Sequence, residues 1–395
     1  MKKRTIHLQK RSLHRFLVLL IVVFLPTAES KPWVPTNENK VLETLPKQQL
    51  RESFECNQLR QQLTHSPTSV STAAHLASCY TKIARSDSDP RYYGYAQACL
   101  NPWWDSKAPP LEILLLRATI RQHFHEYDAA VADLKQFLST RPSDSQAWMT
   151  LATIQQVRGK YDEARISCTA LAGNSSICHA QIMALTGKAE RAYSLLKLQT
   201  QRLQKKIRLI QWLLTLMGET AQRLGLTEQA KKHFTKAIAH ADRDPYLLRV
   251  YSDFLLEQNQ PEKVLALLKD ESRDDALLLR LAIAAQHAGN SNNEYKQELL
   301  DRYRAAQLRG SDLHERDEAR FLLELENRPA EALRLARKNW TLQKEPEDAR
   351  LLMQTAQAAN DTESIQIVLE WINKHGLQDV RINAFINKIS SIRYR

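Results

Sequence analysis

Residues 127–130 read Tyr-Asp-Ala-Ala, and residues 161–164, which lie 34 positions further on, read Tyr-Asp-Glu-Ala. At the same spacing, Leu114 corresponds to Trp148. A repeat of this length typically holds two antiparallel helices of about 13 residues and two turns. One such hairpin cannot bury its apolar face alone, so neighbouring copies have to stack.

The composition also favours an all-helical chain. Its 395 residues include only 9 glycines, whereas β-sandwiches, barrels and doubly wound α/β folds need many for their turns and phosphate-binding loops. Four of the glycines, Gly159, Gly187, Gly225 and Gly289, are expected between paired helices, where a residue with positive φ ends the first helix. With 25% charged and 43% hydrophobic residues, the chain is neither a polytopic membrane protein nor wholly disordered.

In the units that begin at residues 111, 145, 211 and 245, the pattern resembles the tetratricopeptide repeat family. That family places a large residue at slot 4 and small residues at slots 8 and 20, where the two helices cross closely. The unit from Gln211 has Leu214, Gly218 and Ala230 at these slots. The resemblance implies an all-α fold, a right-handed superhelical solenoid of about eight to nine stacked antiparallel helix pairs.

The repeat pattern divides the chain into segments. The solenoid is expected over residues 69–380, with the best repeats at 77–270 and degenerate repeats at 275–380. Residues 31–68 are rich in Pro, Gln and Glu, and we expect a linker and an N-terminal cap there. Residues 381–395 are expected to form a C-terminal tail.

Residues 1–30 have the pattern of a secretory signal peptide. A basic leader precedes an apolar run, Phe16 to Leu25, and small residues follow at Ala28 and Ser30. The run is shorter than the ~20 apolar residues of a spanning helix. We therefore expect an exported, periplasmic protein with no membrane span after cleavage. An uncleaved leader that anchors the chain in the inner membrane is the alternative.

Charge outside the leader is modest. Without residues 1–30 the formal net charge falls from +12 to +7, so we expect no nucleic-acid partner. One basic cluster remains on an expected helix, at Arg202, Lys205, Lys206 and Arg208. A solvated helix face is its first interpretation, and contact with a membrane surface or an acidic partner is the second.

All five cysteines follow the leader, and export permits disulfides. Spacing suggests two pairings to test first, Cys79 with Cys99 and Cys168 with Cys178, although connectivity does not follow from sequence. The odd count then leaves Cys56 as the expected free thiol. No C-x-x-C motif is present, so neither a redox site nor a zinc knuckle is indicated.

The sequence contains no G-x-S-x-G, H-E-x-x-H, P-loop or G-x-G-x-x-G motif. We expect no catalytic residues, no cofactor and no metal site, and hence no enzyme. The expected role is a scaffold that binds a partner protein or extended peptide, the partner being a membrane or exported protein. One alternative is an accessory component of an inner-membrane transport or envelope-assembly system, including a system that handles a metal. Another is a helical enzyme that acts on carbohydrate or cell wall.

The resemblance also implies where a partner binds. In the family, slots 2, 5, 9 and 12 of each first helix line the concave face of the superhelix, and such a polar wall can hydrogen-bond an extended peptide. The residues expected on this wall are Thr119, Gln122, Gln146, Met149, Thr153, Gln156, Trp212, Thr215, Glu219, Tyr246, Arg249 and Asp253.

One further stretch, residues 89–104, is dense in aromatic residues. Packing inside the first repeat is its first interpretation. The second is an exposed aromatic patch that anchors a partner, because Trp and Tyr are enriched in interface hot spots. This candidate patch consists of Tyr92, Tyr95, Trp103 and Trp104.

Overall fold

A computed structural model describes residues 54–171, 173, 175–203, 207–240, 243–290, 293–308 and 315–393. The expected signal peptide, residues 31–53 of the expected linker, and Lys205 and Lys206 lie outside the described residues.

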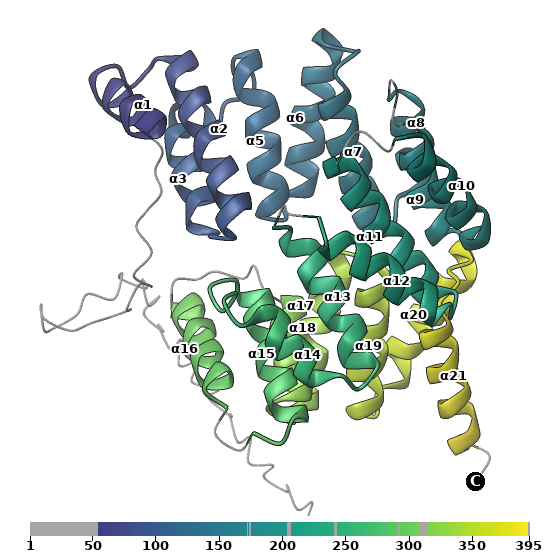
Figure 1. Cartoon of the computed structure of the whole chain (residues 1–395). Helices are drawn as coiled ribbons and strands as arrows, with labels where there is room; N and C mark the ends of the chain where they lie inside the picture. The colour runs from purple at the N-terminus through teal and green to yellow at the C-terminus, as the bar shows by residue number, and fades with distance from the viewer. Residues whose placement is uncertain are drawn as a thin grey trace, which may run out of the picture. The chain divides into compact units, whose positions relative to one another are not determined.

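Within the described ranges every regular element is an α-helix (Figure 1). The first ten helices are α1 (Phe54–His65), α2 (Val70–Asp87), α3 (Arg91–Cys99), α4 (Asn101–Trp104), α5 (Leu111–His123), α6 (Tyr127–Thr140), α7 (Ser145–Val157), α8 (Tyr161–Thr169), α9 (Ser175–Leu185) and α10 (Ala189–Arg202). The others are α11 (Ile207–Arg223), α12 (Thr227–Ile238), α13 (Pro245–Glu257), α14 (Pro261–Leu268), α15 (Asp275–His287), α16 (Glu294–Leu308), α17 (Glu315–Glu324), α18 (Pro329–Leu342), α19 (Pro346–Ala358), α20 (Thr362–His375) and α21 (Val380–Arg393).

These helices pack as consecutive pairs, from α2–α3 and α5–α6 through to α19–α20. The first helices α5 and α7 begin 34 residues apart, at Leu111 and Ser145. The prediction of an all-α fold built from stacked helix pairs is confirmed. Helix α1 falls within the expected N-terminal cap, and α21 occupies most of the segment expected to be a tail.

The turns within pairs use residues with positive φ. Gly159, Gly187, Gly225 and Gly289 have φ between 71° and 80°, so each ends its helix in the left-handed conformation that glycine adopts most easily. Three turns without glycine use asparagine instead, at Asn259, Asn327 and Asn360. Asparagine tolerates this conformation better than other residues with a side chain.

The close crossing expected at slots 8 and 20 is present in the pair α11–α12. Ala230 is fully buried. A Cβ atom added to Gly218 would lie 2.6 Å from Cε1 of Phe234 on α12. Glycine is therefore required at this position by the aromatic ring beside it.

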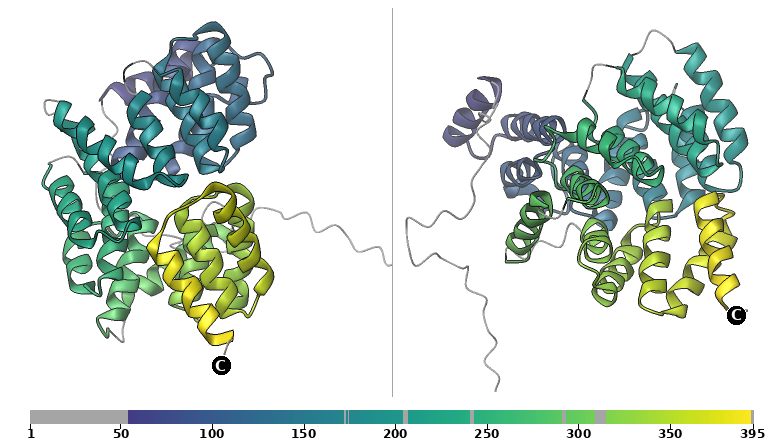
Figure 2. Two further views of the ribbon diagram at one scale, coloured as in Figure 1. Left: turned by 90° about the vertical axis from the view of Figure 1, so that its right-hand side faces the viewer. Right: turned by 60° about the horizontal axis from the view of Figure 1, so that its bottom comes forward.

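The last helices contact the turns of much earlier pairs. The N–H of Lys344 donates to the carbonyl of Val157 at 2.7 Å, and the amide of Gln343 donates to the hydroxyl of Tyr127 at 2.7 Å. Further along, the N–H of Ala189 donates to the side-chain carbonyl of Gln378 at 3.0 Å. Two further views show α18–α21 beside these earlier helices (Figure 2).

The disulfides correct one expected pairing. Cys168 on α8 is bonded to Cys178 on α9, which is the pairing suggested by spacing. Cys79, however, is bonded to Cys56, because α1 packs on α2 and brings the two Cα atoms to 6.0 Å. The expected Cys79–Cys99 pair is therefore wrong, and Cys99 rather than Cys56 is the free thiol.

Candidate functional site

Two residues expected on the binding wall are instead buried. Thr119 donates its hydroxyl to the carbonyl of Leu115 at 2.8 Å, and Thr215 donates to that of Gln211 at 2.9 Å. Both hydroxyls are satisfied within their own helices, so the expectation that they face a partner is wrong. A threonine in a helix can always return its hydroxyl to the preceding turn in this way.

The remaining wall residues of the early repeats are more accessible. Gln146 is exposed, while Gln122, Met149, Thr153 and Gln156 are half-buried. Trp212 on α11 is also half-buried, because its ring packs on a core cluster that includes Leu196 and Met217.

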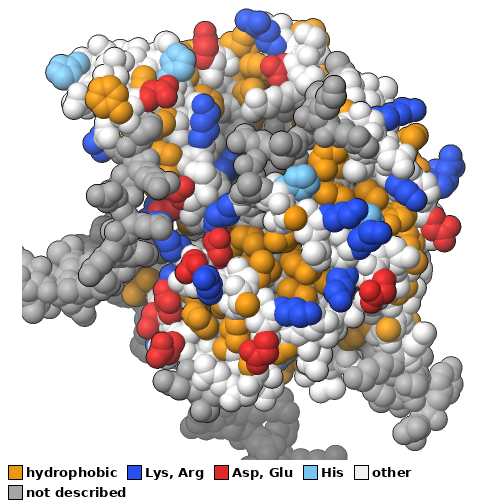
Figure 3. Space-filling model, in the orientation of Figure 1, with side chains coloured by type: hydrophobic (Ala, Val, Ile, Leu, Met, Phe, Trp, Pro, Cys, Tyr) orange, Lys and Arg blue, Asp and Glu red, His pale blue; other side chains and the backbone are white. Residues whose placement is uncertain are grey.

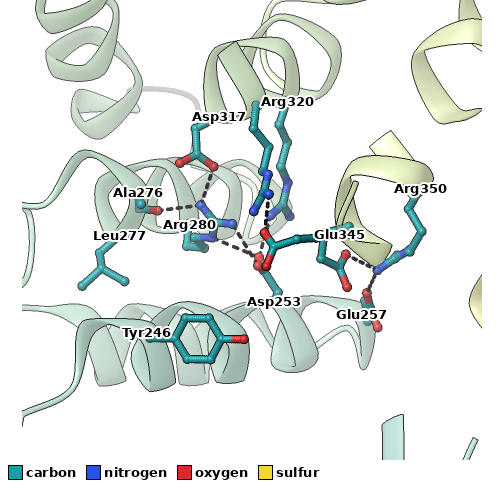
Figure 4. A network of polar contacts seen from close by, with 12 residues as sticks. Tyr246, Asp253, Glu257, Ala276, Leu277, Arg280, Asp317, Arg320, Glu345 and Arg350 are labelled. Carbon is teal, nitrogen blue, oxygen red and sulfur yellow. Dashed lines mark hydrogen bonds and ion pairs between the residues drawn. The ribbon is translucent and has the colours of Figure 1, made fainter. Parts of the chain in front are cut away.

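One wall residue of the later repeats, Asp253, belongs to a network of ion pairs (Figure 4). Asp253 on α13 binds Arg280 on α15 at 2.9 Å and Arg320 on α17 at 2.5 Å. Arg280 also binds Asp317 at 2.9 Å. Each contact joins the first helix of one pair to the first helix of another.

The network continues into the last helices. Arg316 binds Glu345 at 2.5 Å and Asp348 at 2.6 Å. Arg350 on α19 binds Glu257 at the end of α13 at 2.5 Å. Arg381 on α21 binds Glu347 and Glu257 as well, at 2.9 and 3.2 Å.

These charges stabilise one another. Burial alone would raise the pKa of Asp253, but Arg280 and Arg320 hold it well below its usual range. Burial would likewise raise the pKa of Glu347, and Arg381 and Arg350 lower it to about 2. The inner side of the later repeats therefore provides its own counter-ions and needs none from a ligand.

Tyr246 marks the border of this network. Its hydroxyl donates to Glu219 at 2.7 Å, and the guanidinium of Arg249 lies 5.1 Å from its ring centroid. Burial raises the pKa of Glu219, and the nearby Arg223 together with the hydrogen bond from Tyr246 opposes this effect. On its other side, Tyr246 faces an open groove.

This groove has a volume of about 790 Å³. It lies between α2, α3 and α5 on one side and the first turns of α11, α13 and α15 on the other. Its lining consists of Ala84, Arg85, Ser86, Ser88, Pro90, Tyr93, His123, Gln211, Arg243, Asp244, Pro245, Tyr246, Asp274, Asp275 and Ala276.

Arg243 ties the two sides of the groove together. Its guanidinium donates to the carbonyl of Ser86 at 2.9 Å and the hydroxyl of Ser88 at 3.2 Å, and it pairs with Glu271 at 2.6 Å. On the α3 side, the ring of Tyr93 stacks on that of His123 at 3.8 Å between centroids. The groove thus joins an aromatic wall to polar groups held in place by defined partners.

Two carboxylates at the groove also start helices. Asp244 accepts from the N–H groups of Tyr246 and Leu247, and Asp274 accepts from those of Ala276 and Leu277. Burial raises the pKa of Asp274. An aromatic wall with polar groups along an open groove can accommodate an extended peptide segment.

Of the twelve expected wall residues, Tyr246 alone lines this groove. Sequence analysis missed the others because they come from helix ends of repeats that are far apart in the chain. The Asp-Pro pair at residues 244–245 marks the start of α13, but no local signal shows that α2 ends opposite it.

The aromatic stretch mostly packs inside the fold. Tyr92 and Trp104 are only 3% and 8% exposed and belong to the core around α2 and α5. Trp103 is half-buried, and Tyr95 is 49% exposed. The expected aromatic patch is therefore reduced mainly to Tyr95, because the other rings fill the first repeat.

Among the described residues, no group of three or more His, Cys, Asp and Glu side chains is placed to hold a metal ion. No described helix is both long and apolar enough to cross a membrane.

No family model matches the chain, and no curated protein sequence matches it. Solved structures with a similar arrangement include a tetratricopeptide repeat protein from Parabacteroides merdae, with 17% identity, a TM-score of 0.35, and coverage of 62% of this chain and 98% of that one. The APC/C hetero-tetramer Cut9–Hcn1 has 13% identity, a TM-score of 0.34, and coverage of 76% and 52%. Yeast Tom70 has 12% identity, a TM-score of 0.30, and coverage of 80% and 61%.

The chain thus spans about half of the Cut9–Hcn1 chain and about three fifths of Tom70. All three TM-scores lie well below 0.5. The fold is therefore assigned from the chain's own consecutive helix pairs and their 34-residue spacing, and it is a tetratricopeptide-repeat-like fold.

Proposed function

We propose that this protein is an exported, periplasmic, non-catalytic scaffold that binds a segment of a partner protein in the groove between α2–α5 and α11–α15. The groove is the observation that carries the proposal, because it is open, about 790 Å³ in volume, and lined by aromatic and polar groups. Export is supported by the leader pattern of residues 1–30.

The ion-pair network makes the inner side of the later repeats an unfavourable place for a partner to bind. On the inner side of the later repeats, Asp253, Arg316 and Arg381 each bind two or more oppositely charged partners. A ligand there would have to break charge-assisted contacts that are partly buried, which is costly. A partner segment can occupy the groove without breaking the ion pairs of this network.

A blocking substitution tests the site. Ala276 is the second residue of α15 and lines the groove, so Ala276→Trp places a large ring in it without removing the Asp274 cap. Ala330, the second residue of α18, is exposed and outside the groove, so Ala330→Trp is the matched control.

Partners cross-linked to the tagged full chain in its native envelope should be the same for the unmodified protein and Ala330→Trp, and should be lost with Ala276→Trp. If Ala276→Trp keeps the full set of partners in unchanged amounts, the groove is not the binding site.

A further inference from the structure

The exposed surface of α10 and α12 is rich in basic residues. The two helices carry six of them and only two acidic residues, Glu190 and Glu228, so their formal net charge is +4. All six basic side chains are exposed. We call them the α10–α12 basic surface, which consists of Arg191, Lys197, Arg202, Lys231, Lys232 and Lys236.

Three of these lysines surround one histidine. The hydroxyl of Tyr193 on α10 and Nε2 of His233 on α12 form a hydrogen bond of 2.7 Å, which joins the two helices. Burial lowers the pKa of His233 to about 4, and Lys236, Lys232 and Lys197 add to this effect. The three ammonium groups therefore share one small region of the surface.

The α10–α12 basic surface has no counter-charges of its own. None of its six residues forms an ion pair or hydrogen bond within the described part of the chain, in contrast to the arginines of the inner network. Lys232 and Lys236 are one helical turn apart, where like charges repel. An external anion near these side chains would relieve this repulsion.

The α10–α12 basic surface lies outside the groove. None of its six residues lines the groove or a second, smaller pocket, whose lining includes Glu219, Tyr246 and Asp253. Leu198, next to Lys197, is 41% exposed. Figure 3 shows Lys and Arg side chains gathered over α10–α12 with hydrophobic side chains between them.

We propose that the α10–α12 basic surface docks the protein on an anionic phospholipid membrane. Flexible lysines act as point charges with little geometric demand, which suits a fluid layer of headgroups. A tightly bound acidic protein would favour a pocket for an anchoring side chain, and single-stranded nucleic acid would favour aromatic platforms for its bases. None of the six basic residues lines either pocket, and the two rings beside them, Tyr193 and His233, are engaged with each other.

Vesicle binding by the full chain tests this proposal. Vesicles of phosphatidylcholine alone are compared with vesicles that also contain phosphatidylglycerol, at low and at raised salt. The variant K197Q/K232Q/K236Q removes three charges from the surface. The control K82Q/K107Q/K135Q removes three charges from exposed lysines elsewhere. All proteins carry the same N-terminus, so any contribution of the leader cancels.

We expect binding that requires phosphatidylglycerol and weakens with salt. The surface variant should bind roughly a hundredfold more weakly, and the control variant should bind within a few-fold of the unmodified protein. The proposal is overturned if both variants lose the same affinity, or if phosphatidylglycerol has no effect. It is also overturned if polyglutamate or DNA binds to the surface while the anionic vesicles do not.

This proposal does not depend on the groove. Ala276→Trp should leave vesicle binding unchanged, and K197Q/K232Q/K236Q should leave the cross-linking of partner proteins unchanged. The two proposals therefore fail separately.

Discussion

The backbone N–H of Lys344, between α18 and α19, donates a hydrogen bond to the carbonyl of Val157, the last residue of α7. The hydroxyl of Tyr161 on α8 contacts the carbonyl of the same Lys344 at 3.5 Å, and its ring packs against Trp371 on α20. Repeats usually contact only their sequence neighbours. Here, contacts between repeats nearly 190 residues apart add long-range cooperativity.

The close approach of Gly187 and Gly376 gives a test of this long-range contact. A Cβ added to Gly187 would lie 3.2 Å from the carbonyl oxygen of Gly376, whereas one added to Gly289 would meet nothing within 4 Å. Gly187 and Gly289 both have positive φ, so the backbone strain of Gly→Ala costs about 1 kcal/mol at each of these two positions. We expect Gly289→Ala to lower the free energy of unfolding by that amount and Gly187→Ala by about 2–3 kcal/mol. Equal losses in urea unfolding would argue against the contact.

Gly218 tests the helix crossing. Alanine is favoured over glycine in a helix by about 1 kcal/mol, but a Cβ here would overlap the ring of Phe234, and overpacking costs about 1–3 kcal/mol. We expect Gly218→Ala to destabilise the protein. Gly94 in α3 has open space around it, so Gly94→Ala should stabilise it by about 0.5–1 kcal/mol. Thermal unfolding checks both predictions: the melting temperature should fall for Gly218→Ala and rise for Gly94→Ala.

His233 predicts a pH dependence of stability. Its folded-state pKa of about 4 lies below the unfolded value of about 6.5. The unfolded chain therefore binds more protons between these values, and stability falls as the pH drops from about 6.5 towards 4. His233→Gln should flatten this part of the profile in urea unfolding, whereas the same change at the exposed His65 should leave it intact. An unchanged slope in His233→Gln would show that other groups cause it.

The disulfides make a prediction that differs from the one drawn from spacing. Peptide mapping without reductant should recover Cys56 linked to Cys79, and Cys168 linked to Cys178. Burial raises the pKa of Cys99 to about 11, so alkylation of its thiol should be slow in the native protein and fast after unfolding. Removing either bridge by a Cys→Ser pair should cost about 3 kcal/mol. A peptide linking Cys79 to Cys99 would contradict the structure.

The helix pairs and their turns could be predicted from the sequence because they are determined by residues close together in the chain. The turn glycines, such as Gly159 and Gly225, end helices through their own backbone conformation, and the small residue at Gly218 reports a crossing within one pair. The same reasoning could not show that Gly187 touches Gly376. That contact depends on the summed rotation of all the intervening repeats.

The site was harder to predict for the same reason. Slot positions placed Asp253 on an inner face, but they could not reveal that Arg280 and Arg320 neutralise it from two other helices. The groove was missed because Ser86 and Arg243, which contact each other across it, are 157 residues apart. Sequence patterns describe faces of single helices, and this groove is made from helix ends.

Cross-linking from the groove tests the central claim most directly. Tyr93 and Tyr95 lie on the same short helix α3, but Tyr93 lines the groove and Tyr95 is exposed outside it. A photoreactive amino acid is placed at one position or the other in the full chain, within its native envelope. We predict a partner cross-linked from position 93, not from position 95, and lost when Ala276→Trp is added. Cross-links from position 95 alone, or from both positions regardless of Ala276→Trp, would contradict the account.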